Sequence, residues 1–175
     1  MSNPIQSVKD QLAELFNEAL FAQQGIVADY TADDLTFADP VLYDAAVIDL
    51  TAPTARNSSV LVSVEVPQED DSTLPLENTL HYNRLQIARL ISNYGGEIEA
   101  SGEEASTHDL LALLSAALGT ELLADDIEDE LLEEVDAETY TCTLRASATS
   151  LGYFGEGEIT VKFPAATPPD DGDPA

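Results

Sequence analysis

Cations are the scarcest component of this chain of 175 residues, which has 6 Lys and Arg against 34 Asp and Glu and a formal net charge of -28 at pH 7. Phosphate contacts require clustered cations, so we expect no direct binding to nucleic acid. Anionic membrane surfaces are disfavoured for the same reason. A cation, a basic protein partner, a salty medium or simple solubility remain as explanations of the acidity.

Cysteine is nearly absent, since Cys142 is alone. One cysteine excludes both a disulfide framework and a cysteine-based zinc site. Its place on the apolar side of an alternating stretch predicts a small core residue. The start, MSNPIQSVKDQL, lacks the basic and apolar regions of a secretory signal. No apolar run approaches the length of a membrane-spanning helix, so we expect no membrane association.

Residues that typically carry catalysis are also sparse. The two histidines, His81 and His108, lie far apart and near no nucleophile in a recognisable signature. The glycines at 152, 155 and 157 lack the spacing of a phosphate-binding loop. No carboxylate pair stands out among so many acids. The sequence therefore predicts a protein that is not an enzyme, with no catalytic, cofactor-binding or metal-binding residues.

Calcium is the one metal that the composition keeps as a weaker alternative. Two acidic clusters supply hard oxygen ligands, and neither has the EF-hand pattern. They are Asp125, Asp126, Glu128, Asp129 and Glu130 in the first, and Asp170, Asp171 and Asp173 in the second. A solvated acidic face is the simpler interpretation.

Apolar spacing predicts two main helices. Over residues 4–24, Asn3 provides a cap, Pro4 a first position and Gly25 a stop, around an apolar stripe that includes Leu12, Leu15 and Phe16. Over residues 107–118, Ser106 or Thr107 caps a leucine-rich helix that Gly119 ends. A shorter acidic helix is expected over residues 124–132.

Alternating apolar residues predict two hairpins. Residues 60–66 and 79–85 form the first, and residues 140–148 and 158–163 form the second. Residues 150–157 connect the second pair through a loop too long for a tight turn, which predicts a packed, bent connection. Residues 97–99 are a candidate edge strand.

The expected fold is therefore α+β, with antiparallel hairpins forming a sheet or small sandwich and the two helices packed on it. We predict a single domain over residues 1–163, followed by a Pro- and Asp-rich tail over residues 164–175. Both halves also run helix, Gly, Ala-Asp-Asp and paired strands in the same order. An internal duplication, with repeat units 4–85 and 107–163, is plausible.

Four stretches resemble a family of virion structural proteins from large-genome contractile-tailed bacteriophages. They are SNPIQSVKDQL, LHYNRLQIARL, THDLLALLSAALGTELLADDIEDE and TLRASATSLGYFGEGEITV. The least generic parts are residues 82–85, the block from Asp109 to Ile127, and residues 150–155. The loop at residues 68–71, Gln-Glu-Asp-Asp, departs from the family pattern.

The resemblance implies a non-enzymatic structural or accessory component of a tailed-phage virion, made in the host cytoplasm and contacting other virion proteins in multiple copies. It does not distinguish capsid, neck, sheath and baseplate. The alternative is a soluble acidic binding module, such as a nucleic-acid-mimic inhibitor of a basic host protein. As candidate protein-contact residues we name Arg84, Leu151, Tyr153 and Phe154; Arg84 could pair with acids of a partner or with internal ones.

Overall fold

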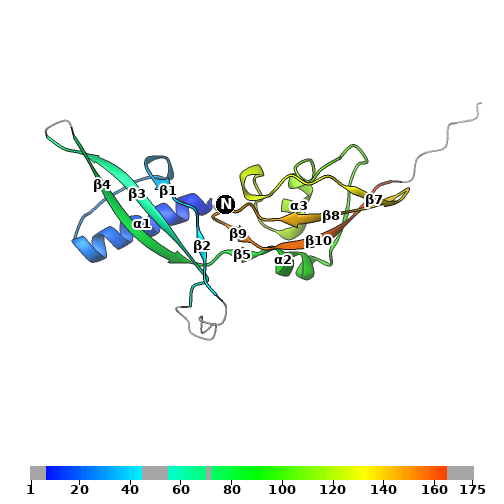
Figure 1. The fold of residues 1–175 in the computed structure, drawn as a ribbon, viewed down its shortest axis with the longest axis horizontal. Coiled ribbons are helices and arrows are strands. Elements are labelled where there is room, and N and C mark those ends of the chain that lie inside the picture. The colour runs from blue at the N-terminus through cyan, green and yellow to red at the C-terminus, as the bar shows by residue number, and fades with distance from the viewer. Residues whose placement is uncertain (1–6, 45–54, 70–71, 165–175) are drawn as a thin grey trace, which may run out of the picture. The chain divides into compact units, whose positions relative to one another are not determined.

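A computed structural model describes residues 7–44, 55–69 and 72–164. The fold is α+β, with helices packed on antiparallel sheets, as the sequence predicts (Figure 1). The chain divides into two compact units, and the single domain expected over residues 1–163 stays a prediction. Unit 1 comprises Met1–Leu85 and Ser147–Phe154, and unit 2 comprises Gln86–Ala146 and Gly155–Ala175. The predicted tail lies outside the described residues from position 165 onward.

Unit 1 begins with helix α1 (Val8–Gln24). Its cap is Ser7, whose hydroxyl accepts the Asp10 N–H; the predicted cap, Asn3, lies outside the described residues. Gly25 ends the helix in the left-handed conformation, with φ of 69°. A short 3₁₀ turn, η1 (Ala32–Asp34), follows.

The sheet of unit 1 is built around a long hairpin. Strand β3 (Ser58–Pro67) pairs antiparallel with β4 (Thr73–Tyr82), with Val60 opposite Leu80. The short strands β1 (Thr36–Phe37) and β2 (Val41–Leu42) pair with the other edge of β3. The first predicted hairpin is therefore confirmed, and β3 is its central strand.

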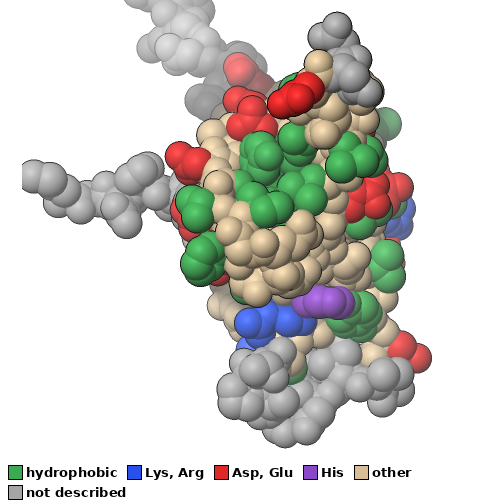
Figure 2. All heavy atoms as spheres, turned by 90° about the vertical axis from the view of Figure 1, so that its left-hand side faces the viewer, with side chains coloured by type: hydrophobic (Ala, Val, Ile, Leu, Met, Phe, Trp, Pro, Cys, Tyr) green, Lys and Arg blue, Asp and Glu red, His purple; other side chains and the backbone are tan. Residues whose placement is uncertain are grey.

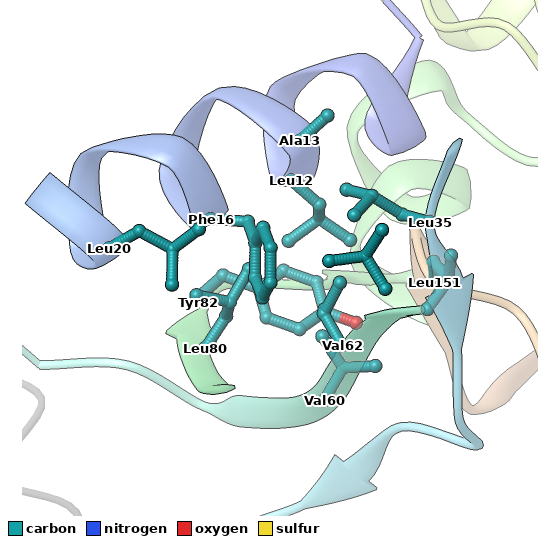
Figure 3. Packing of buried hydrophobic residues seen from close by; sticks show 11 residues of the cluster. Leu12, Ala13, Phe16, Leu20, Leu35, Val60, Val62, Leu80, Tyr82 and Leu151 are labelled. Atoms are coloured by element: carbon teal, nitrogen blue, oxygen red, sulfur yellow. The ribbon is translucent and has the colours of Figure 1, made fainter. Parts of the chain in front are cut away.

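Helix α1 covers one face of this sheet (Figure 3). Phe16 and Leu20 are fully buried in one cluster with Val60, Val62 and Val64, because alternate side chains of β3 face the core. Leu15, a member of the predicted helical stripe, lies outside this core and is 39% exposed.

Unit 2 contains the second predicted hairpin, β8 (Thr139–Arg145) and β10 (Glu156–Lys162), paired antiparallel. Strand β7 (Glu133–Asp136) flanks β8, and β6 (Glu97–Glu99) runs parallel to β10, so residues 97–99 do form an edge strand. Helix α2 (Ile87–Tyr94) packs on β10, and α3 (Leu111–Leu118) packs on α2 and β6. Strands β5 (Leu85–Gln86) and β9 (Tyr153–Phe154) are short segments where the chain changes units.

Three helix predictions were too long. Helix α1 begins at Val8, after the extended cap residue Ser7, rather than at residue 4. Helix α3 begins at Leu111 rather than at residue 107, because Thr107 Oγ1 accepts the Glu130 N–H and donates to the Glu128 carbonyl, which ties this residue to the segment 128–130. The expected acidic helix over residues 124–132 is limited to the 3₁₀ turn η2 (Ala124–Asp126). Ile127 is extended and bridges to Ala146, which ends the turn.

The suggested duplication has local parallels. Gly119, like Gly25, ends its helix in the left-handed conformation. Both Ala-Asp-Asp segments form 3₁₀ turns whose last aspartate accepts an N–H three residues earlier, Asp34 from Thr31 and Asp126 from Leu123. In unit 2, however, it is α2 that packs on β10. Duplication therefore stays a prediction.

Candidate protein-contact site

The four candidate contact residues lie together in unit 1. The segment Ser147–Phe154 connects β8 and β10 in sequence yet belongs to unit 1. Leu151 joins the core made by α1 and β3, and Tyr153 is 2% exposed (Figure 3). The Leu85 N–H also donates to the Gly152 carbonyl at 2.8 Å. The packed, bent connection that the sequence predicts is confirmed.

Arg84 contacts both β3 and the segment Ser147–Phe154. Its Nε donates to Ser58 Oγ at 3.0 Å, and Nη1 donates to the carbonyls of Ser150 and Tyr153 at 3.1 and 3.3 Å. The guanidinium carbon lies 5.8 Å from the centroid of the Phe154 ring. Its own backbone is clamped by the Asn57 side chain, which accepts the Arg84 N–H and donates to the Arg84 carbonyl.

The partners of this buried cation are neutral. Arg84 is 7% exposed, and no carboxylate of the described residues forms an ion pair with it. Burial lowers its pKa, although a guanidinium remains charged at physiological pH. In the structure, Arg84 therefore pairs with backbone carbonyls of the same chain rather than with acidic side chains. A contact of these four residues with another protein stays a prediction.

Sequence reasoning missed a shallow, open groove between α1 and the edge of β4, with a volume of about 380 Å³. The helix side is one stripe of residues spaced by three or four positions. The lining residues are Leu15, Glu18, Ala19, Ala22 and Gln23 from α1, and Asn78, Thr79, Leu80 and His81 from β4. The signal was present in the sequence, since Leu15, Ala19 and Ala22 extend the apolar face of the helix beyond what one sheet covers.

Unit 1 also exposes large apolar side chains. They are Leu15, Phe21, Ile26, Val27, Val41, Leu42, Leu61, Leu74 and Leu85. Figure 2 shows hydrophobic side chains gathered on the face seen from the left of Figure 1, with acidic side chains beside them. Phe21 is 62% exposed and Val27 is 86% exposed, which places costly apolar area in water.

The histidines and acids that the sequence singled out do not converge. His81 Nδ1 is hydrogen bonded to Tyr43 Oη in unit 1, whereas His108 Nε2 is hydrogen bonded to the Ile127 carbonyl in unit 2. Among the described residues there is no cluster of three metal-ligating side chains, and no helix long and apolar enough to cross a membrane.

Several acids of the first cluster already contact other side chains of this protein. Arg145 Nη1 lies 3.4 Å from Glu128 and 3.0 Å from Glu130. Hydrogen bonds from Ser106 and from the His108 N–H lower the pKa of Asp129. These contacts favour the interpretation as a charged surface. The second cluster, residues 170–173, lies outside the described residues.

Comparison with known proteins gives the family of the chain. No curated protein and no solved structure matches it. One protein family does, over residues 4–166, a span that includes both units apart from the chain ends. The chain belongs to this family of unknown function, DUF7941.

Proposed function

We propose that this protein is a non-enzymatic structural or accessory component of a tailed-phage virion, and that it acts through contacts with neighbouring subunits in the particle. The phage assignment rests on the resemblance of its sequence motifs. The mode of action is supported by the surface of unit 1, where a groove, an exposed apolar face and a strand edge occur together.

The exposed apolar side chains carry the proposal. Single apolar residues are common on protein surfaces, but hydrophobic side chains gathered on one face, as Figure 2 shows for unit 1, are typical of interaction sites. Burying them against a neighbour removes apolar area from water, which stabilises the contact by about 25 cal/mol for each Å² buried. The groove beside them gives such a contact shape as well as area.

The charge of the chain suits assembly with a different protein. A net charge of -28 opposes association between copies of the chain and favours docking on a basic neighbour. Copies would then stay separate until a cationic surface is present. Electrostatic complementarity would thus determine which partner binds, and burial of the apolar face would stabilise the complex.

Mass spectrometry of purified particles, with copy-number estimation, tests the proposal. We expect the protein in the particles at a fixed ratio to the other virion proteins. A high copy number indicates a lattice component, and a low one matching the tail symmetry indicates the tail axis. Detection in infected-cell lysate and never in particles refutes the proposal.

The acidic binding module makes the opposite prediction. A pull-down from host lysate would then recover a nuclease or a polymerase, and the protein would be absent from particles. Its acids would have to stand at phosphate-like spacing on one face. In the described residues, Glu128, Glu130 and Glu156 instead surround Arg145, which neutralises part of that charge.

A further inference from the structure

Strand β4 has an unpaired edge, because among the described strands it pairs only with β3. The Gln68 N–H donates to the Ser72 carbonyl at 2.8 Å, which shows which residue pairs of β3 and β4 are hydrogen bonded to each other. In an antiparallel pair, hydrogen-bonded positions alternate with non-bonded ones. The even-numbered residues of β4 therefore bond to β3, and the odd-numbered ones turn their backbone groups outward.

Hydrogen bonds at the opposite edge of β3 agree with this alternation. There the Ala38 N–H donates to the Leu61 carbonyl at 3.0 Å, and the Tyr43 N–H donates to the Asn57 carbonyl at 2.8 Å. Odd-numbered residues of β3 thus bond away from β4, as the register requires.

Part of the exposed edge of β4 is blocked by proline. Pro75 occupies an outward position, where it has no N–H to offer, a common protection of edge strands. Beyond it, Glu77, Thr79 and His81 present outward N–H and C=O groups. Thr79 and His81 also line the groove, so the open part of the edge lies beside it.

The groove has room and an apolar wall on the helix side. Ala19 and Ala22 are short side chains that leave space between α1 and β4, and Leu15 adds an apolar surface. On the strand side, the Asn78 Nδ2 is buried and has no hydrogen-bond partner among the described residues. A strand added to β4 would place alternate side chains against this helix wall.

The charges at the groove are acidic. Glu18 lines it, and Glu77 stands on the outer side of β4, opposite Ser63. No Lys or Arg is among the lining residues. This local charge, together with the net charge of -28, disfavours a second copy of the chain as the occupant.

We propose that residues 77–81 of β4 accept an extended segment of a basic partner protein as an added strand. Apolar side chains of this segment face Leu15, Ala19 and Ala22, and alternating Lys or Arg side chains face outward toward Glu77. Main-chain hydrogen bonds give affinity, and the alternation gives specificity. This inference rests on the proposed function, because it names the chemistry of the neighbouring subunit.

Binding of synthetic peptides to the full chain tests the proposal. The probe is a capped Lys-Val-Lys-Val-Lys-Val-Lys peptide, followed by fluorescence anisotropy at about 0.15 M salt, where exposed charges are screened beyond about 8 Å. Two control peptides carry N-methyl groups either on all Val or on all Lys residues. We expect one series to bind about tenfold more weakly or worse and the other to bind as the parent peptide does, since each blocks a different edge.

Two proline variants locate the site. Thr79→Pro removes an outward N–H beside the groove, in the arrangement that Pro75 already shows this strand accommodates. Thr73→Pro removes an outward N–H beyond Pro75, away from the groove lining. We expect the first to weaken peptide binding about tenfold and the second to leave it unchanged, with matching circular dichroism spectra.

Equal binding of all three peptides, or equal effects of both variants, overturns the proposal, because charge alone would then explain the affinity. A dimer of the chain that Thr79→Pro dissociates overturns it in favour of a second copy. These results are separable from the function itself. Particles that contain the protein, combined with no peptide binding, would reject only the added strand, whereas peptide binding with no protein in particles would reject only the virion role.

Discussion

Replacing Arg84 by Met tests whether the buried guanidinium holds the Ser147–Phe154 segment in unit 1. Three hydrogen bonds are lost, to Ser58, Ser150 and Tyr153. Hydrogen bonds of a charged group contribute about 1.5–3 kcal/mol each, which gives a gross loss of about 5–9 kcal/mol. Relief from burying a cation offsets several kcal/mol of this. We expect a net loss of about 2–4 kcal/mol in the free energy of unfolding.

Urea unfolding followed by circular dichroism measures the loss. Arg89→Met is the matched control, because Arg89 is exposed on α2. Met keeps an apolar stem of similar length, so packing changes little at either site. Hydrogen exchange adds a local measure: the amides of residues 147–154 should lose protection in Arg84→Met and keep it in Arg89→Met. Equal urea midpoints for the two variants, or unchanged exchange in this segment, would refute the reasoning.

Three further predictions concern buried groups. Tyr82→Phe should leave stability at pH 7 unchanged or slightly higher, because the hydroxyl is buried with no hydrogen-bond partner among the described residues. Burial raises the pKa of Tyr82 from 10.0 to about 12, so folding favours the protonated phenol. The resulting stabilisation is complete below about pH 10 and is lost as pH rises through about 12. In Tyr82→Phe, the urea midpoint should therefore fall less steeply over that pH range. Burial, and then the charge of Glu130, raise the pKa of Cys142 to about 12, so a disulfide reagent should label it slowly at pH 8 in the native protein and fast in urea. Gly157→Ala would place a Cβ 2.9 Å from Ile91 Cδ1 and 3.2 Å from Ala88 Cα, and should cost about 1–3 kcal/mol in thermal or urea unfolding, whereas unchanged stability would mean that α2 shifts freely on β10.

Local patterns predicted the elements well. The strict alternation of Val60, Val62 and Val64 indicated a half-buried strand, and all three face the core. Gly25 and Gly119 indicated helix ends and have the left-handed conformation that a helix end favours. These successes share a cause, because periodicity and caps depend on residues close together in the chain.

Predictions that depended on distant partners failed or were missed. A short acidic helix was expected over residues 124–132, but Ile127 pairs with Ala146 and the backbone becomes extended. The division into two units was not evident either, because Ser147–Phe154 leaves the second hairpin to complete the core of unit 1. The apolar spacing of α1 indicated the helix side of the groove, but the groove itself depends on how α1 lies against β4, which the sequence does not show.

Two of the three least generic stretches of the phage resemblance meet in the structure. Residues 82–85 supply Arg84 and Leu85, and residues 150–155 supply the carbonyls of Ser150, Gly152 and Tyr153 that accept from them. A pattern shared at both stretches is therefore what a common fold requires, since neither is useful without the other. Arg84, Leu151 and Tyr153 are buried by this contact, which leaves other residues of unit 1 exposed. For that reason the groove and the open edge of β4, rather than the family-like motifs, are where partner specificity should be sought.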